Sequence, residues 1–291
     1  MKRNFYTLDQ TLDESHWLAS ATLIYSSGDL GQSVKPNALT REDITPLRYH
    51  HRLGKHFEDL FTKCIKKTNT INSVHDHIQV IDKGITLGEA DFVLGQNDAW
   101  LHLEIAIKFF LKVGKQGRLE DYLGPSLSDS LDRKIQHLTN KQLKLFTHPA
   151  AKEQLTQRGI PHIDHCIAQV YGWLYYHIED TQPTIPSALN PHHSRGLWCV
   201  TNELPDYVAS LPDSFEFLIP LRGEWLVSPV HQTGRTYDKA TLLNYFNKPS
   251  NEAEQVMVIS GVGRSRQLIA RLFVVTEEWQ TSANKQIEAQ S

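Results

Sequence analysis

The sequence is poor in cysteine and has no long apolar run. Its three cysteines, Cys64, Cys166 and Cys199, are widely spaced and odd in number, which excludes the disulfide framework of small secreted domains. No run of about 18 apolar residues exists, so we expect no membrane span. The charged N-terminus also has no apolar stretch suited to secretion. These absences predict a reduced, cytoplasmic protein.

Several sequence motifs of common enzymes are also absent. Fifteen histidines are present, but none has the paired Cys/His spacing of a structural zinc site, and no HExxH motif occurs. No GxSxG motif supports a serine hydrolase. The segment Gly261–Arg266 (GVGRSR) lacks the third glycine and the strand–helix context of a dinucleotide-binding fold. The sequence therefore disfavours these three classes.

A strong net charge is missing too, because the formal charge is −3. The total therefore does not indicate nucleic-acid binding. The distribution is uneven, however, since residues 108–158 contain ten Lys and Arg against five Asp and Glu. Such a local excess either meets a phosphate backbone or forms a solvated helix face.

What is present is the composition of a globular α/β protein, with 40% apolar and 22% charged residues. Apolar residues three and four apart predict a helix between Ile44 and Lys67. Three strands should follow, with hairpin turns at Lys83–Gly84 and Gly95–Asp98. The expected strands are 75–82, 85–94 and 99–111.

Beyond this hairpin region we expect a loop over 112–128, a helix over 129–146 and a strand over 165–177. The proline-rich stretch Thr181–Gly196 is the best candidate boundary. We therefore expect an N-terminal segment packed on the core (1–43), a core (44–180) and a C-terminal α+β extension (181–291). In the extension we expect strands at 196–201, 215–220, 224–229, 255–260 and 267–275, and a helix at 238–246.

Acidic residues interrupt the second and third expected strands. In the third strand every second residue from Leu101 to Phe109 is apolar, and these residues form one face. His102, Glu104 and Lys108 lie on the other face. Glu89 and Asp91 lie on the strand before it. Carboxylates crowded on adjacent strands resist ionising together unless a cation compensates. A metal site is the economical explanation.

The order helix, three strands, helix, strand resembles the core of the PD-(D/E)XK nuclease superfamily, a mixed sheet flanked by helices. Asp91 in GEAD matches the first acid of that pattern, Glu104 matches the second, and Glu58 corresponds to a first-helix glutamate of some members. More specifically, the chain resembles the bacterial domain-of-unknown-function family eighteen fifty-three. The segments that carry this likeness are RLGKHFEDLF, TLGEADFVL, HLEIAIKFFL, LGPSLSDSLDRKIQHLTNKQL and ARLFVVTEEW.

The resemblance implies a nuclease that hydrolyses phosphodiester bonds with Mg²⁺ or Mn²⁺. Asp91 and Glu104 would be the metal ligands, with Glu89 or Glu58 assisting and the main-chain carbonyl of Ile105 as a further oxygen. Mg²⁺ is usually held by one or two carboxylates plus waters and phosphate. It would polarise the phosphate and acidify a bound water.

The chain departs from the superfamily pattern at the lysine. Ala106 stands two positions after Glu104, where the pattern has lysine. Lys108 lies on the same face about 13 Å further along a regular strand and is our first choice for the role. Lys134, on the following helix, is the alternative.

Four residues are expected to contact nucleic acid: Lys134, Gln142, Lys112 and Lys115. Two alternatives remain open at this point. The departure at Ala106 supports an inactive nuclease-fold module that binds nucleic acid or protein. A metal-dependent hydrolase of a small phosphorylated substrate is a third hypothesis.

Overall fold

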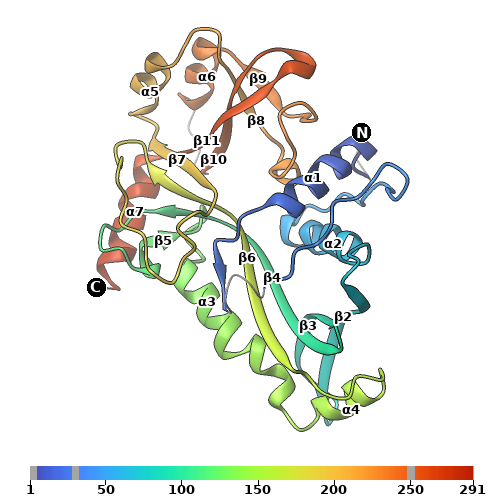
Figure 1. The fold of residues 1–291 in the computed structure, drawn as a ribbon. Helices are drawn as coiled ribbons and strands as arrows, with labels where there is room; N and C mark the ends of the chain where they lie inside the picture. The colour runs from blue at the N-terminus through green and yellow to red at the C-terminus, as the bar shows by residue number, and fades with distance from the viewer. Residues whose placement is uncertain (1–4, 28–32, 248–252, 291) are drawn as a thin grey trace. The chain divides into compact units, whose positions relative to one another are not determined.

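The computed structural model describes residues 5–27, 33–247 and 253–290. Residues 1–4 and 28–32 of the expected N-terminal segment lie outside these ranges. The described part is an α/β protein with a large mixed sheet flanked by helices (Figure 1). Its residues form two compact units: unit 1 comprises 1–107, 133–172 and 188–190, and unit 2 comprises 108–132, 173–187 and 191–291.

The two units alternate along the chain. Strands β4 (Ala99–Lys112) and β6 (His165–His177) contribute residues to both units. The predicted boundaries at 43/44 and 180/181 instead divide the chain linearly, and they stay predictions.

Unit 1 contains most of the predicted core elements. Its sheet order is β2-β3-β4-β6, with β1 paired to β6. The helix expected between Ile44 and Lys67 is confirmed as the shorter helix α2 (Leu53–Ile65). The strand expected at 165–177 is confirmed as β6, with the same bounds. The other elements of unit 1 are α1 (Leu8–Ser20), β1 (Tyr25–Ser26), β2 (Ile71–Asp82), β3 (Ile85–Gln96), α3 (Leu131–Asn140, from Arg133 onward in this unit), the 3₁₀ helix η3 (Gln142–Thr147) and α4 (Ala151–Thr156).

Two tight turns join β2, β3 and β4 into consecutive antiparallel hairpins. Asp82 pairs with Ile85, and Gln96 pairs with Ala99, so each turn has two residues. Asn97 and Asp98 have φ of 47° and 65°, the left-handed conformation that matches the twist of a hairpin. The turn predicted at Lys83–Gly84 is confirmed, and the one predicted at Gly95–Asp98 is confirmed over Asn97–Asp98 alone, because Gly95 and Gln96 pair within β3.

Helices cover the hairpins through apolar side chains. In α2 the buried residues recur at helical spacing, and Phe61 lies 5.2 Å from the Phe92 ring of β3, measured between ring centroids. In η3 and α4, Leu145, Phe146 and Leu155 pack against a buried cluster with Ala90 of β3. A Cβ on Gly88 would lie 3.0 Å from Leu145, so glycine permits this close approach.

Unit 2 has the sheet order β7-β11-β10-β8-β9. Strand β7 pairs in parallel with β11, whereas β10 pairs antiparallel with both β11 and β8. Its elements are η2 (Leu119–Asp121), β5 (Tyr122–Leu123), β7 (Arg195–Val200), α5 (Leu204–Ser210), β8 (Glu216–Ile219), η4 (Arg222–Glu224), β9 (Arg235–Tyr237), α6 (Lys239–Phe246), β10 (Glu254–Ser260), η5 (Gly263–Ser265), β11 (Gln267–Val275) and α7 (Glu277–Glu288).

Three sequence predictions of secondary structure are wrong, wholly or in part. The loop expected over 112–128 contains the 3₁₀ helix η2 and the short strand β5. The strand expected at 224–229 is the end of the 3₁₀ helix η4 followed by turns, in which Leu226 and Val227 are buried without pairing in the sheet. The helix expected over 129–146 divides into α3 and η3 after Asn140. None of the described helices is long and apolar enough to cross a membrane.

Candidate functional site

Asp91 and Glu104 meet where strands β3 and β4 separate. The ladder between these strands runs from Gln96–Ala99 to Phe92–Leu103 and ends immediately before the two acids. Beyond that point side chains take over the backbone hydrogen bonds. The N–H of Ile105 donates to Oδ2 of Asp91 at 2.9 Å, and the N–H of Asp91 donates to Oε1 of Glu104 at 3.3 Å.

The Glu104 carboxylate is fully buried and held by two further side chains. His102, on the same face of β4, contacts Oε1 through Nε2 at 2.7 Å. Gln142 of η3 donates from Nε2 to Oε2, and its Oε1 lies 3.0 Å from Nδ1 of His137. Phe146 of η3 contacts the His102 ring edge to face. Because η3 covers the polar face of β4, this face is buried as well as the apolar one.

Both acids have pKa values raised to about 7. For Asp91 the largest cause is burial, followed by repulsion from Glu104. For Glu104 burial is again the largest cause, and the hydrogen bonds with Asp91 and the charge of Lys134 oppose it. Two carboxyl groups so close together titrate as a pair. The pair therefore retains protons at a pH where ordinary carboxylates have none.

His102 is the neutral member of this cluster. Burial lowers its pKa to about 4, so the ring carries no charge near neutral pH. When Glu104 is ionised, this contact requires that Nε2 bear the proton and donate it to Oε1. His102 thus orients the carboxylate without neutralising it.

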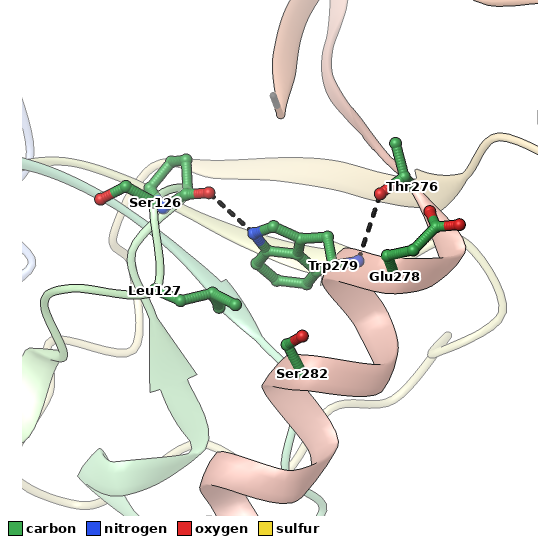
Figure 2. A pocket seen from close by; sticks show the side chains of 7 residues that line it. Ser126, Leu127, Thr276, Glu278, Trp279 and Ser282 are labelled. Carbon is green, nitrogen blue, oxygen red and sulfur yellow. Dashed lines mark hydrogen bonds between the residues drawn. The ribbon is translucent and has the colours of Figure 1, made fainter. Parts of the chain in front are cut away.

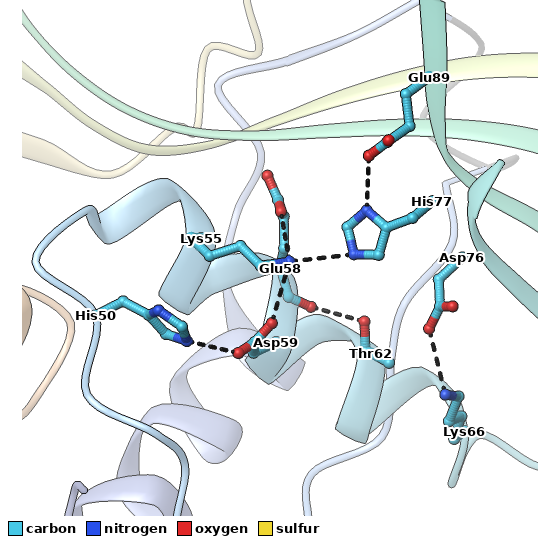
Figure 3. A network of polar contacts seen from close by, with 9 residues as sticks. All are labelled: His50, Lys55, Glu58, Asp59, Thr62, Lys66, Asp76, His77 and Glu89. Atoms are coloured by element: carbon cyan, nitrogen blue, oxygen red, sulfur yellow. Dashed lines mark hydrogen bonds and ion pairs between the residues drawn. The ribbon is translucent and has the colours of Figure 1, made fainter. Parts of the chain in front are cut away.

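Glu58 of α2 is electrostatically coupled to the acid pair, since its charge raises the pKa of both Asp91 and Glu104. Its own partner is Lys55, whose ammonium lies 3.3 Å from Oε2 of Glu58 and 3.4 Å from Oδ1 of Asp59 (Figure 3). Burial lowers the pKa of Lys55, but the attraction of the two carboxylates outweighs it and raises the pKa overall.

Glu89 belongs to a neighbouring network (Figure 3). Its Oε1 lies 3.0 Å from Nδ1 of His77, and Nε2 of His77 lies 3.2 Å from the Lys55 ammonium. The pKa of Glu89 is lowered, chiefly by a hydrogen bond from Gln79. His77 has φ of 51°, which is uncommon for a residue other than glycine and frequent at functional sites.

Lys108 and Lys134, the two candidate lysines, have different surroundings. In unit 2, the Lys108 ammonium lies 2.5 Å from Oδ2 of Asp129. In unit 1, Lys134 of α3 lowers the pKa of Glu104. Lys134 is therefore the lysine whose charge acts on Glu104, while the Lys108 charge is engaged by Asp129.

The remaining expected nucleic-acid contacts also differ. Lys112 was expected to contact nucleic acid, which requires an ammonium that faces solvent. Instead its side chain is only 4% exposed and pairs with Asp180 at 3.3 Å. Lys115 lies exposed in the loop after β4. Gln142 contacts Glu104 directly, which places it at the acid pair.

The described ranges contain no group of three or more His, Cys, Asp or Glu side chains arranged to hold a metal ion. Of the four carboxylates predicted as metal ligands, Asp91 and Glu104 lie together, and Glu58 is coupled to them by charge. Glu89 belongs to the separate network with His77. A pocket of about 230 Å³ in unit 2, lined by Leu127, Thr276 and Trp279 among others (Figure 2), contains none of the predicted site residues.

The sequence reasoning left Lys55 and His77 out of the site. Helical spacing places Lys55 beside Glu58 and Asp59, three and four positions on, which was a usable signal. His77 contacts both Glu89 and Lys55, and no sequence pattern indicates these contacts or the left-handed backbone at a strand histidine.

The fold and this acid pair, in which Glu104 is fully buried and Asp91 half-buried, define an α/β protein with a candidate catalytic centre in unit 1. Residues 29–275 match the model of the family described as a domain of unknown function (DUF1853). The chain belongs to this family. No curated protein and no solved structure matched the chain.

Proposed function

We propose that this protein is a divalent-metal-dependent nuclease with a PD-(D/E)XK-like core in unit 1. The order of α2, β2, β3, β4, α3 and β6 supports the core. The observation that carries the proposal is the Asp91–Glu104 pair, whose carboxyl groups lie at the point where two adjacent strands separate. Two carboxylates with waters and phosphate are a usual ligand set for Mg²⁺.

The donor chemistry of the pair fits a divalent cation. Burial raises both pKa values, and the charges of Glu104 and Glu58 raise that of Asp91 further; a bound cation would favour the ionised form of both acids. Asp91 and Glu104 would hold the ion. When bound, such an ion polarises a phosphate and acidifies water.

The other residues of the site orient the Glu104 side chain or favour its ionised form. His102 and Gln142 fix the orientation of Glu104. Lys134 favours the ionised form of Glu104, and its positive charge suits the stabilisation of a phosphate that gains negative charge. We therefore assign the lysine role to Lys134 in preference to Lys108, which pairs with Asp129.

One observation favours the second candidate, a catalytically inactive module that binds nucleic acid. Ala106 occupies the position where the superfamily pattern has lysine, so a group from another element must replace it. If Lys134 does not replace it, the acid pair binds metal without efficient cleavage.

The test is incubation of the purified protein with plasmid DNA, single-stranded DNA and structured RNA in Mg²⁺ or Mn²⁺. We expect cleavage by the wild type and its loss in D91N and E104Q. D98N is the matched control, because Asp98 is an exposed acid in the turn of the same hairpin. Cleavage that persists in both site variants would contradict the proposed site. Metal binding without cleavage of any substrate would favour the inactive module.

A further inference from the structure

A stripe of basic side chains runs along α3 and into η3 in unit 1. Lys134, His137 and Lys141 are spaced three, four and seven residues apart, which places them on one helix face. The helical bonding continues to Lys141, whose N–H donates to the carbonyl of His137 at 3.2 Å. Lys144 follows Lys141 by three residues, and side chains three apart are eclipsed in a 3₁₀ helix. We name these four residues the basic stripe.

The segment from Arg133 to Lys152 is rich in positive charge. Residues 133–152 contain five Lys and Arg and no Asp or Glu. Lys141 and Lys144 are exposed, and neither forms an ion pair with another described residue. Among the basic residues of 108–158, Lys108 and Lys112 pair with Asp129 and Asp180 in unit 2. Lys141 and Lys144 are exposed neighbours on one segment of unit 1.

The segment that carries the basic stripe also contacts the acid pair through its inward-facing side chains. Leu145 and Phe146 of η3 pack into the cluster around Ala90. Gln142, between the two exposed lysines, bridges His137 and Glu104. The same short helix therefore presents ammonium groups outward and a hydrogen-bond donor inward to Glu104.

From this arrangement we infer that the basic stripe binds the sugar-phosphate backbone of a nucleic-acid strand that extends past the acid pair. The inference deepens the proposed function and rests on it for the reaction. It identifies the substrate as a polymer, because the charges of Lys141 and Lys144 would have no role toward a single small phosphate at Asp91 and Glu104. Binding itself requires neither metal nor cleavage.

The test measures binding of a fluorescent 20-nucleotide single-stranded DNA by anisotropy in EDTA, at several salt concentrations. We compare wild type with K141Q/K144Q. The matched control is K35Q/K285Q, which changes the net charge equally at two other exposed lysines. Loss of two phosphate contacts should weaken binding by about tenfold near 0.1 M salt and reduce the salt slope by about 1.4. K141E/K144E should weaken binding further.

The outcomes separate this inference from the proposed function. If K141Q/K144Q weakens binding and the control pair does not, the stripe is the binding surface, whether or not the protein cleaves the DNA. If the wild type cleaves DNA in Mn²⁺ but K141Q/K144Q binds as tightly as the control, the inference is overturned and the nuclease stands. Binding to phosphatidylserine vesicles through these lysines, without binding to the oligonucleotide, would also overturn it.

Discussion

Asp91 and Glu104 exchange hydrogen bonds crosswise between two diverging strands. The Glu104 carboxylate accepts from the Asp91 amide, and the Asp91 carboxylate accepts from the amide of Ile105, which directly follows Glu104. Each acid thus satisfies a backbone donor that the interrupted ladder leaves without a partner strand. These hydrogen bonds favour the ionised carboxylates, but burial outweighs them and raises both pKa values, and repulsion from Glu104 adds to the shift of Asp91.

Metal binding should strengthen with pH. Metal ligands must be deprotonated, and both acids have pKa values of about 7. From pH 6 to pH 8 the Mn²⁺ affinity should therefore rise by about ten- to a hundredfold, with release of one to two protons. Calorimetry in buffers of different ionisation enthalpy measures both quantities. A constant affinity without proton release would contradict the coupling.

Stability should depend on the ionisation of Asp91. Because its pKa is raised on folding, the folded chain binds more protons than the unfolded chain between about pH 4 and pH 7. The free energy of unfolding therefore falls as pH rises through this window. D91N lacks this loss, so the stability of D91N relative to wild type should increase by roughly 2–4 kcal/mol from pH 4 to pH 8.

Urea unfolding of D91N, wild type and the control D98N at both pH values measures this effect. The control should follow the wild type. If the difference between D91N and wild type is the same at pH 4 and pH 8, then Asp91 does not titrate near neutral pH and the burial argument is wrong.

The two lysines should rank differently in a cleavage assay. K134Q removes the charge that favours ionised Glu104 and should lower the cleavage rate by about a hundredfold, in the range found when one stabilising donor is lost. K108Q removes a partly exposed ion pair with Asp129, which contributes only about 1 kcal/mol or less to stability. The reverse ranking of cleavage rates would return the role to Lys108.

His102 should matter for the orientation of Glu104. H102A removes a buried ring and the donor to Oε1, so we expect a loss of about 2–4 kcal/mol in the free energy of unfolding. Under conditions in which H102A remains folded, it should bind Mn²⁺ more weakly than wild type. Unchanged metal affinity in the folded variant would limit His102 to a role in packing.

Much of unit 1 could be predicted because its elements have strong patterns. A nearly continuous apolar run between His165 and His177 gives β6 its bounds, and the two-residue turns give the hairpins theirs. Helix α7 was not predicted because only Trp279 and Ala283 are buried along it, which is too weak a periodicity. The strand expected at 224–229 was wrong because burial there comes from tertiary packing around turns.

The acid pair could be predicted in type but not in detail. Strand alternation placed Asp91 and Glu104 on neighbouring strands, and charge crowding indicated a cation. The strands' divergence, which exposes backbone donors to both carboxylates, has no sequence signal. The contact of Gln142 with Glu104 has no sequence signal either, because it depends on the break between α3 and η3 after Asn140.

The most direct test of the account is Mn²⁺ binding at pH 8, measured by calorimetry on wild type, D91N, E104Q and D98N. We expect binding by the wild type and D98N, and its loss in both D91N and E104Q while the two variants remain folded. Wild-type affinity in D91N and E104Q would contradict the assignment of Asp91 and Glu104 as the metal-binding pair.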